Sequence, residues 1–130
     1  DKRSSKILDI QTNNLVSLLG YDKENKLQIR ILAKAEIEES KKTLFDVWSD
    51  MYPMSKECYR VNHAPGKVVS SKDDVFFEEE GADKMNGFEN FTIVNCYIDS
   101  IETLFLHSSG HLRAKYQNEN NRFIGQWLVP

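Results

Sequence analysis

The chain is poor in the residues and runs that would place it in several large classes of protein. Its 130 residues include only two cysteines, Cys58 and Cys96, which lie far apart and form no CxxC or Cys/His cluster. We therefore expect reduced, buried thiols, and neither a disulfide nor a zinc site. No apolar run is long enough to span a bilayer, and Asp1–Lys6 lacks the apolar core of a signal peptide. A cytoplasmic protein is expected.

Other absences narrow the chemistry. The sequence has no glycine-rich dinucleotide loop, no GxSxG and no HExxH pattern, which weighs against a nucleotide cofactor held by a Rossmann turn. Its net charge of -3 weighs against a nucleic-acid partner. With 40% hydrophobic and 28% charged residues, the length predicts a single globular domain over residues 1–130 with one core.

The central feature of the sequence is a pair of strand-like runs between Leu15 and Ile37, joined by a turn at Asp22–Asn25. From Leu27 onward the odd positions are apolar and most even positions are polar, and this period of two is typical of a half-buried strand. The first run is apolar on both faces. We therefore expect it inside a sheet and not at an edge.

A short helix is predicted before this hairpin. Apolar residues spaced for one helix face precede Asn13, and Ser4 or Ser5 is the expected N-cap. Serine hydroxyls, free backbone N–H groups and the cations of Arg3 and Lys6 make such a helix start physically suited to a phosphate. The commoner alternative is a capped surface helix with solvated cations.

The middle of the chain predicts helix and then loop. Apolar residues at helical spacing predict an amphipathic helix that begins after Ser40 and stops before Pro53. Its aromatic stripe is expected to pack against the sheet and not to bind a ligand. Residues 55–60 suit a further helical turn. From residue 66 to 90 charge is high and periodicity is poor, which indicates a long surface loop with at most a short helix.

The last third predicts four short strands, over residues 91–99, 103–107, 111–117 and 122–129, as in a meander that closes a barrel. In the third of them His111, Arg113 and Lys115 alternate with apolar residues. An ordinary exposed polar face is one explanation. The alternative is an anion-binding cleft, formed together with Phe105 and His107 on the preceding strand.

Several short segments occur in an order that is more specific than any one of them. They are Arg3-Ser4-Ser5-Lys6, the Asn-x-x-Val-Ser-Leu-Leu-x-Tyr-Asp run of residues 13–22, Lys26-Leu27-Gln28-Ile29-Arg30, the Trp48 helix, Ser55–Arg60, Ala64-Pro65-Gly66, and the C-terminal His111–Tyr116 and Trp127–Pro130. Together they resemble the pyridoxamine 5'-phosphate oxidase-like family of flavin-binding split barrels, over nearly the whole chain. The resemblance implies a mainly β, Greek-key split barrel of the FMN-binding type with two or three flanking helices. It also implies that one or more family strands precede the segment where this chain begins.

The family resemblance implies an FMN-binding homodimer and an FMN-dependent oxidoreductase, with the flavin in a cleft shared by two subunits. The residues at the family's cofactor positions are Arg3, Ser4 and Lys6 for the phosphate, and Gln28, Phe105 and Lys115 for the flavin ring. On the cofactor side, three positions depart from the family pattern: Ser5 and Lys115 each replace an arginine, and Phe105 replaces a tryptophan. Lys115 keeps the charge but not the fork of donors of an arginine.

On the substrate side the resemblance points to a small anionic molecule. The residues at the family's substrate positions are Tyr52, Lys56, Arg60, His111 and Arg113. Lys56 replaces an arginine and loses its bidentate clamp, so oxidation of pyridoxine phosphate itself is not expected. Two alternatives remain open: a non-catalytic flavin-binding or flavin-sensing module, and a haem-binding split barrel that uses His107 or His111.

Overall fold

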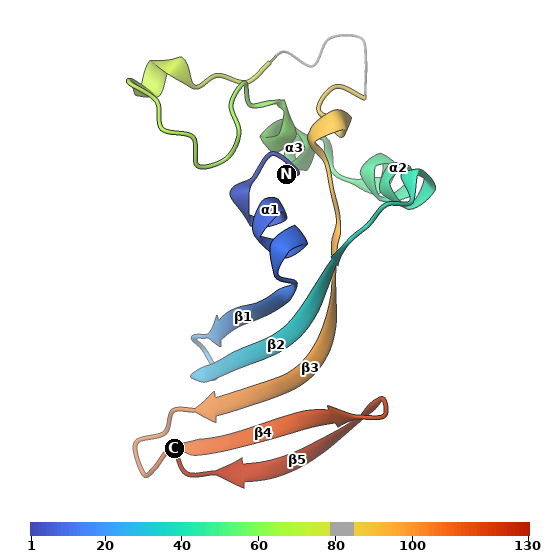
Figure 1. Cartoon of the computed structure of the whole chain (residues 1–130). Helices are drawn as coiled ribbons and strands as arrows, with labels where there is room; N and C mark the ends of the chain where they lie inside the picture. Colours follow the sequence, from blue (N-terminus) through green and yellow to red (C-terminus); the bar gives the residue numbers. More distant parts are fainter. Residues whose placement is uncertain (79–84) are drawn as a thin grey trace. The chain divides into compact units, whose positions relative to one another are not determined.

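A computed structural model of the protein describes residues 1–78 and 85–130 (Figure 1). The chain divides into two compact units. One contains Asp1–Asn13 and Ile37–Asn95, and carries the helices α1 (Ser5–Thr12), α2 (Lys41–Asp50) and α3 (Pro53–Glu57). The other contains Asn14–Glu36 and Cys96–Pro130, and is built on a β-sheet.

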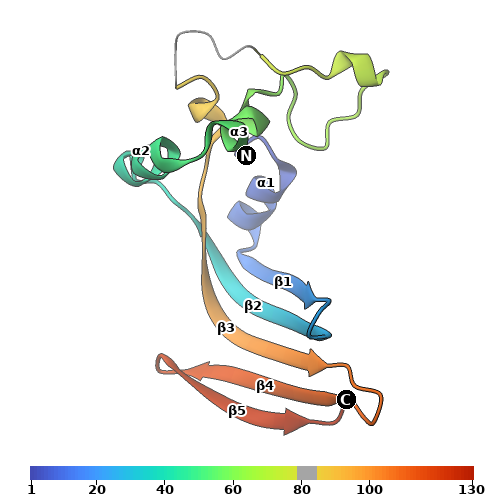
Figure 2. The ribbon, with the colours of Figure 1, turned by 180° about the vertical axis from the view of Figure 1, so that it is seen from behind.

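The sheet has five strands in the order β1-β2-β3-β4-β5, seen side by side in Figures 1 and 2. The strands are β1 (Leu15–Asp22), β2 (Leu27–Ile37), β3 (Val94–Phe105), β4 (Leu112–Glu119) and β5 (Arg122–Leu128). The pairs β1–β2, β3–β4 and β4–β5 are antiparallel. Neighbours in the sheet are also neighbours in the sequence, so the described strands form a meander without a crossover connection. The mainly β class with flanking helices is confirmed.

The β1–β2 hairpin was predicted correctly, including its turn. The Asp22 carboxylate accepts hydrogen bonds from the backbone N–H groups of Glu24 and Asn25 and from the Asn25 side chain. The bonds from Asn25 hold the pKa of Asp22 below its ordinary value. In β2, Ala33 and Ala35 are buried while the residues between and after them are exposed. The period of two in the sequence correctly predicted that one face of β2 is buried and the other is exposed.

The expectation that β1 lies inside the sheet is wrong. β1 pairs with β2 and ends the order of the described strands, and Leu15, Leu19 and Tyr21 are each more than half exposed. Apolar residues on both faces of a strand indicate that both faces suit contact with other apolar groups. Apolar faces do not tell whether a strand has a paired neighbour on one side or on both sides.

The expectation of a break at Ser100 is also wrong, because one twelve-residue strand, β3, spans the two short strands that were predicted there. Ser100 is 3% exposed and pairs with Gln117 across the sheet. Serine has no need of a positive φ, so it is compatible with a strand interior wherever its hydroxyl is accommodated. Its polarity was mistaken for a turn signal.

The helical unit is organised around Trp48 of α2, which is 1% exposed. Its ring centroid lies 5.6 Å from that of Tyr59, 5.7 Å from Phe88 and 5.4 Å from Phe91. All three partners belong to the helical unit, and packing of the aromatic stripe against the sheet stays a prediction. Burial raises the pKa of Tyr59 above its ordinary value, with a smaller effect from Cys58.

Two further expectations concern the cysteines and the loop of residues 66–90. Cys58 and Cys96 are free, as predicted, but the expectation that they are buried is wrong, because both are exposed. Cys58 lies in a short 3₁₀ turn, and Cys96 lies near the start of β3. The loop contains short 3₁₀ helices at Lys72–Asp74 and Phe88–Asn90. Its residues 79–84 lie outside the described part of the chain.

Candidate functional site

An ion pair between strands identifies one face of the sheet. Nη1 of Arg30 in β2 lies 3.6 Å from Oε1 of Glu102 in β3, and Glu102 is directly opposite Lys115 in β4. Residues two apart on a strand share a face, which adds Gln28 and Arg113. We call this the polar face, defined by Gln28, Arg30, Glu102, Arg113 and Lys115. It brings together three of the residues that the sequence assigned to cofactor or substrate.

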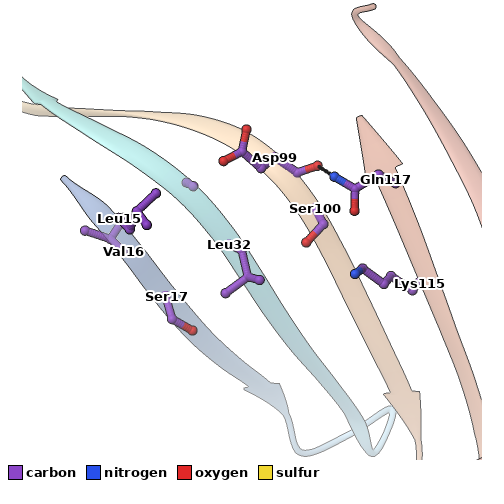
Figure 3. A pocket seen from close by; sticks show the side chains of 9 residues that line it. Leu15, Val16, Ser17, Leu32, Asp99, Ser100, Lys115 and Gln117 are labelled. Carbon is purple, nitrogen blue, oxygen red and sulfur yellow. Dashed lines mark hydrogen bonds between the residues drawn. The ribbon is translucent and has the colours of Figure 1, made fainter. Parts of the chain in front are cut away.

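A pocket of about 360 Å³ opens on this face and takes residues from β1, β2, β3 and β4 (Figure 3). Leu15 and Leu32 give it an apolar wall. Ser17, Ser100 and Lys115 add two hydroxyls and an ammonium group. This combination suits a flat, mostly apolar ligand with a polar or anionic edge.

The cationic side chains of the polar face differ in whether they form an ion pair. Arg113 Nη2 donates to Oε1 of Glu102 at 2.9 Å, so both guanidinium groups converge on the same carboxylate oxygen. Lys115 lies half-buried in the wall of the pocket, and its ammonium makes no hydrogen bond or ion pair with any residue that the structure describes. The predicted cationic row is therefore not uniform: Arg113 is paired and Lys115 is available.

Phe105 and His111 lie apart from this pocket. Phe105 pairs with Leu112, and because it is three residues from Glu102 it belongs to the opposite face of the sheet. Its ring stacks on His107, with centroids 5.7 Å apart. His111 precedes β4, and its Nδ1 accepts a hydrogen bond from the backbone N–H of His107 at 3.2 Å. These contacts hold both histidines in the β3–β4 turn.

The predicted phosphate residues begin the helical unit. Ser4 is the N-cap residue of α1, as expected, but its hydroxyl makes no capping bond. The guanidinium of Arg3 donates from Nη2 to the Asp1 carboxylate at 2.7 Å and from Nη1 to the carbonyl of Val61 at 2.8 Å. Lys6 is exposed. The Arg3 guanidinium is thus engaged within the helical unit, whereas Ser4 makes no capping bond and Lys6 is exposed.

The predicted substrate residues divide between the units. Tyr52, Lys56 and Arg60 belong to the helical unit, whereas His111 and Arg113 belong to the sheet unit. Tyr52 is 80% exposed, the Lys56 ammonium lies 5.4 Å from the centroid of the Trp48 ring, and Arg60 is buried with its Nη2 3.9 Å from Glu57. That these residues act together on a substrate stays a prediction.

Sequence reasoning missed Glu102, Ser17 and Ser100. The signal for Glu102 was available in the β3–β4 register, because an uninterrupted β3 places this carboxylate directly opposite Lys115. The false break at Ser100 concealed that register. Nothing in the sequence marked Ser17, since a serine in a strand is ordinarily a solvated residue.

Within residues 1–78 and 85–130, no cluster of three or more histidine, cysteine, aspartate or glutamate side chains is arranged to hold a metal ion. In the same part of the chain, every helix is too short or too polar to cross a lipid bilayer.

Two solved structures share this architecture. One is a pyridoxamine 5'-phosphate oxidase-related, FMN-binding protein from Nostoc punctiforme PCC 73102, which matches with a TM-score of 0.79 and 19% identity over 100% of this chain and 70% of that one. The chain has the pyridoxamine 5'-phosphate oxidase-like split-barrel fold. PhzG from Burkholderia lata 383, in complex with tetrahydrophenazine-1-carboxylic acid, matches this split barrel with a TM-score of 0.71 and 16% identity. That match covers 99% of this chain and 65% of PhzG.

Neither a family model nor a curated protein matches the sequence. At 19% and 16% identity, the two structures establish the fold, and the resemblance seen in the sequence is confirmed at that level.

Proposed function

We propose that this split barrel binds FMN and acts as an oxidoreductase of the pyridoxamine 5'-phosphate oxidase-like family. The observation that carries the proposal is the pocket on the polar face. In a fold shared with an FMN-binding protein, it is lined by Lys115 and lies on the face that also holds Gln28. These are two of the residues that the family resemblance assigns to the flavin ring.

The residues present fit such a ring. Leu15 and Leu32 offer apolar surface to a planar heterocycle, while Ser17 and Ser100 offer hydroxyls to its polar edge. The half-buried ammonium of Lys115 suits an electron-rich carbonyl or an anion. FMN supplies hydride and electron transfer when bound, so the tasks of the protein are to bind, orient and exclude water.

The remaining assignments belong to the same proposal. Arg3, Ser4 and Lys6 hold the FMN phosphate. Phe105 lies on the opposite face of the sheet from Lys115, so it would contribute to the flavin site of the second copy of the chain and not to the pocket of its own copy. Tyr52, Lys56, Arg60 and His111 orient a small anionic substrate, whereas Arg113, which the resemblance also assigns to the substrate, pairs with Glu102. Two copies of the chain form the shared cleft, in the cytoplasm and without nucleic acid. The tetrahydrophenazine-1-carboxylic acid bound to PhzG supports a ring compound with a carboxyl group as the substrate class.

The visible spectrum of the purified protein tests cofactor binding directly. We expect an isoalloxazine absorbance that survives gel filtration and that is released on denaturation as FMN. A protein that stays colourless after incubation with FMN, riboflavin and FAD disproves the flavin assignment. A haem spectrum instead of a flavin spectrum favours the alternative based on His107 or His111.

Two lysine variants test how the flavin is held. Lys6→Ala removes the proposed phosphate contact and should weaken FMN binding but not riboflavin binding, whereas Lys115→Ala should weaken both. A charge-assisted contact of roughly 1.5 to 3 kcal/mol corresponds to about tenfold or more in Kd. Lys23→Ala, in the exposed β1–β2 turn, is the control. Equal losses for both ligands in the Lys6 variant reject the phosphate role.

A further inference from the structure

The arrangement of charges around Glu102 carries an inference about how the pocket selects its ligand. Glu102 is directly opposite Lys115, where cross-strand side chains are near neighbours and opposite charges normally attract. Its Oε1 instead accepts from Arg113 Nη2 at 2.9 Å and lies 3.6 Å from Arg30 Nη1. Among the described residues, the carboxylate therefore forms its ion pairs with arginines of the two neighbouring strands and none with the lysine opposite it.

The consequence for Lys115 is electrostatic. The Glu102 side chain is only 20% exposed and that of Arg113 33% exposed, so this group of charges is partly shielded from water and its interactions are stronger than those of a surface pair. Two guanidinium groups on one carboxylate leave that group of three with a net charge of about +1, and the ammonium of Lys115 adds to it. Asp99 also lines the pocket, but it is one residue from Ser100, so its side chain belongs to the opposite face of β3. Among the described residues, the Lys115 ammonium has no ion-pair partner beside the apolar wall.

We infer that Arg30 and Arg113 are positioning residues: they hold Glu102 away from Lys115 and so keep the Lys115 ammonium available for the anionic or electron-rich edge of a planar ring in the pocket. This reassigns Arg113, which the sequence placed in contact with the substrate. Arg113 does not line the pocket, and its guanidinium acts on Glu102 instead. The inference deepens the proposed function by naming the ligand class that Lys115 meets, and it rests on that function only in placing a ligand there.

A matched pair of fluorescent probes tests the wild type first. 1-Naphthoate and 1-naphthamide have the same ring and nearly the same shape, but only naphthoate is charged. Naphthoate should bind the flavin-free protein about tenfold or more tightly than naphthamide, because it alone makes a charge-assisted contact with Lys115. Lys115→Met should abolish that preference. Equal affinity of the wild type for the two probes overturns the inference.

The deciding variant is the double change Arg30→Met and Arg113→Met. Without the arginines, Glu102 is free to pair with the lysine opposite it, so naphthoate affinity should fall about tenfold while naphthamide affinity stays unchanged. Adding Glu102→Gln to this double variant should restore naphthoate binding, because the competing carboxylate is gone. A purely structural role of the arginines, or direct contact of Arg113 with the ligand, gives no such rescue. Absence of rescue overturns the inference.

The single variant Glu102→Gln provides a second route if the double variant does not fold. It should retain the preference for naphthoate, since Lys115 stays available, and Glu36→Gln, an exposed glutamate of β2, is the matched control. Loss of the preference in Glu102→Gln but not in the control contradicts the inference. Flavin binding is scored separately by absorbance. A protein that binds naphthoate through Lys115 but binds no flavin retains this inference and disproves the proposed function.

Discussion

Gly87 shows how a single backbone position is fixed by its surroundings. It has a φ of 91° at the start of a short 3₁₀ turn, and a Cβ there would lie 3.0 Å from Cγ of Arg60 and 3.3 Å from the backbone carbon of Tyr59. Gly66 has a similar φ of 82°, but nothing lies within 4 Å of a Cβ built on it. The two glycines therefore separate the effect of backbone conformation from the effect of crowding.

We predict that Gly66→Ala lowers the free energy of unfolding by roughly 1 to 2 kcal/mol, the cost of a left-handed conformation. Gly87→Ala should cost more, by roughly 1 to 3 kcal/mol, because its new methyl group also meets the Arg60 stem and backbone that cannot move aside. Urea unfolding of both variants checks this difference. Equal losses would show that the Tyr59–Arg60 turn yields to the methyl group.

Lys115 and Glu102 show what sequence can and cannot give at the scale of the residue. The alternation along β4 correctly placed Arg113 and Lys115 on the non-core face of their strand. It did not reveal that Arg113 is paired while Lys115 has no ion-pair partner in the described part of the chain, because that depends on Glu102 and Arg30 from two other strands. The residue types on a face follow from periodicity, whereas the partner of each charge follows from register.

The two N-caps of α1 and α2 show the same limit at the scale of the element. Sequence placed a serine at each start, and both are N-cap residues. Only Ser40 accepts a hydrogen bond through its side chain, from the backbone N–H of Thr43 at 3.2 Å. The hydroxyl of Ser4 makes no such bond, although its residue type and position are equally suitable.

We predict that Ser40→Ala lowers the stability of the flavin-free protein by about 1 kcal/mol, whereas Ser4→Ala leaves it unchanged. The Ser4 variant should instead weaken FMN relative to riboflavin, because the proposal gives this hydroxyl to the phosphate. Thermal unfolding and the two flavin titrations measure these effects. A loss of stability in Ser4→Ala together with unchanged FMN affinity would show that Ser4 is an ordinary helix cap and does not contact the phosphate.

The β1–β2 hairpin was predicted correctly, whereas the continuity of β3 and the edge position of β1 were not. The β1–β2 hairpin has strong local signals, namely alternation and an Asp22–Asn25 turn closed by its own side chains, and its bounds followed from them. β3 was divided in two because Ser100 reads locally as a turn residue, while its burial is a tertiary property. The edge position of β1 was missed for a related reason, since sequence reports that a face is apolar but not what covers it.

At the scale of the whole molecule, the exposed apolar side chains are the feature that a single copy leaves unexplained. Trp127, Leu19 and Leu15 are 76%, 69% and 63% exposed, and all three lie on strands at the two ends of the described sheet order. Large apolar side chains on the edge strands of a sheet favour association of two copies, because association covers both the unpaired strand edges and the apolar surface. This agrees with the homodimer that the family resemblance implies.

We therefore predict that the protein is a homodimer at micromolar concentration, which light scattering measures as twice the 15.1 kDa of the chain. Because apolar burial would drive the association, the dimer should persist when the salt concentration is raised to about 1 M, where the Debye length is only about 3 Å and exposed ion pairs are screened. Dissociation by salt alone would indicate an electrostatic interface. A strictly monomeric protein that still binds FMN tightly would refute the shared cleft, and the flavin site would then have to be formed by the residues of one chain.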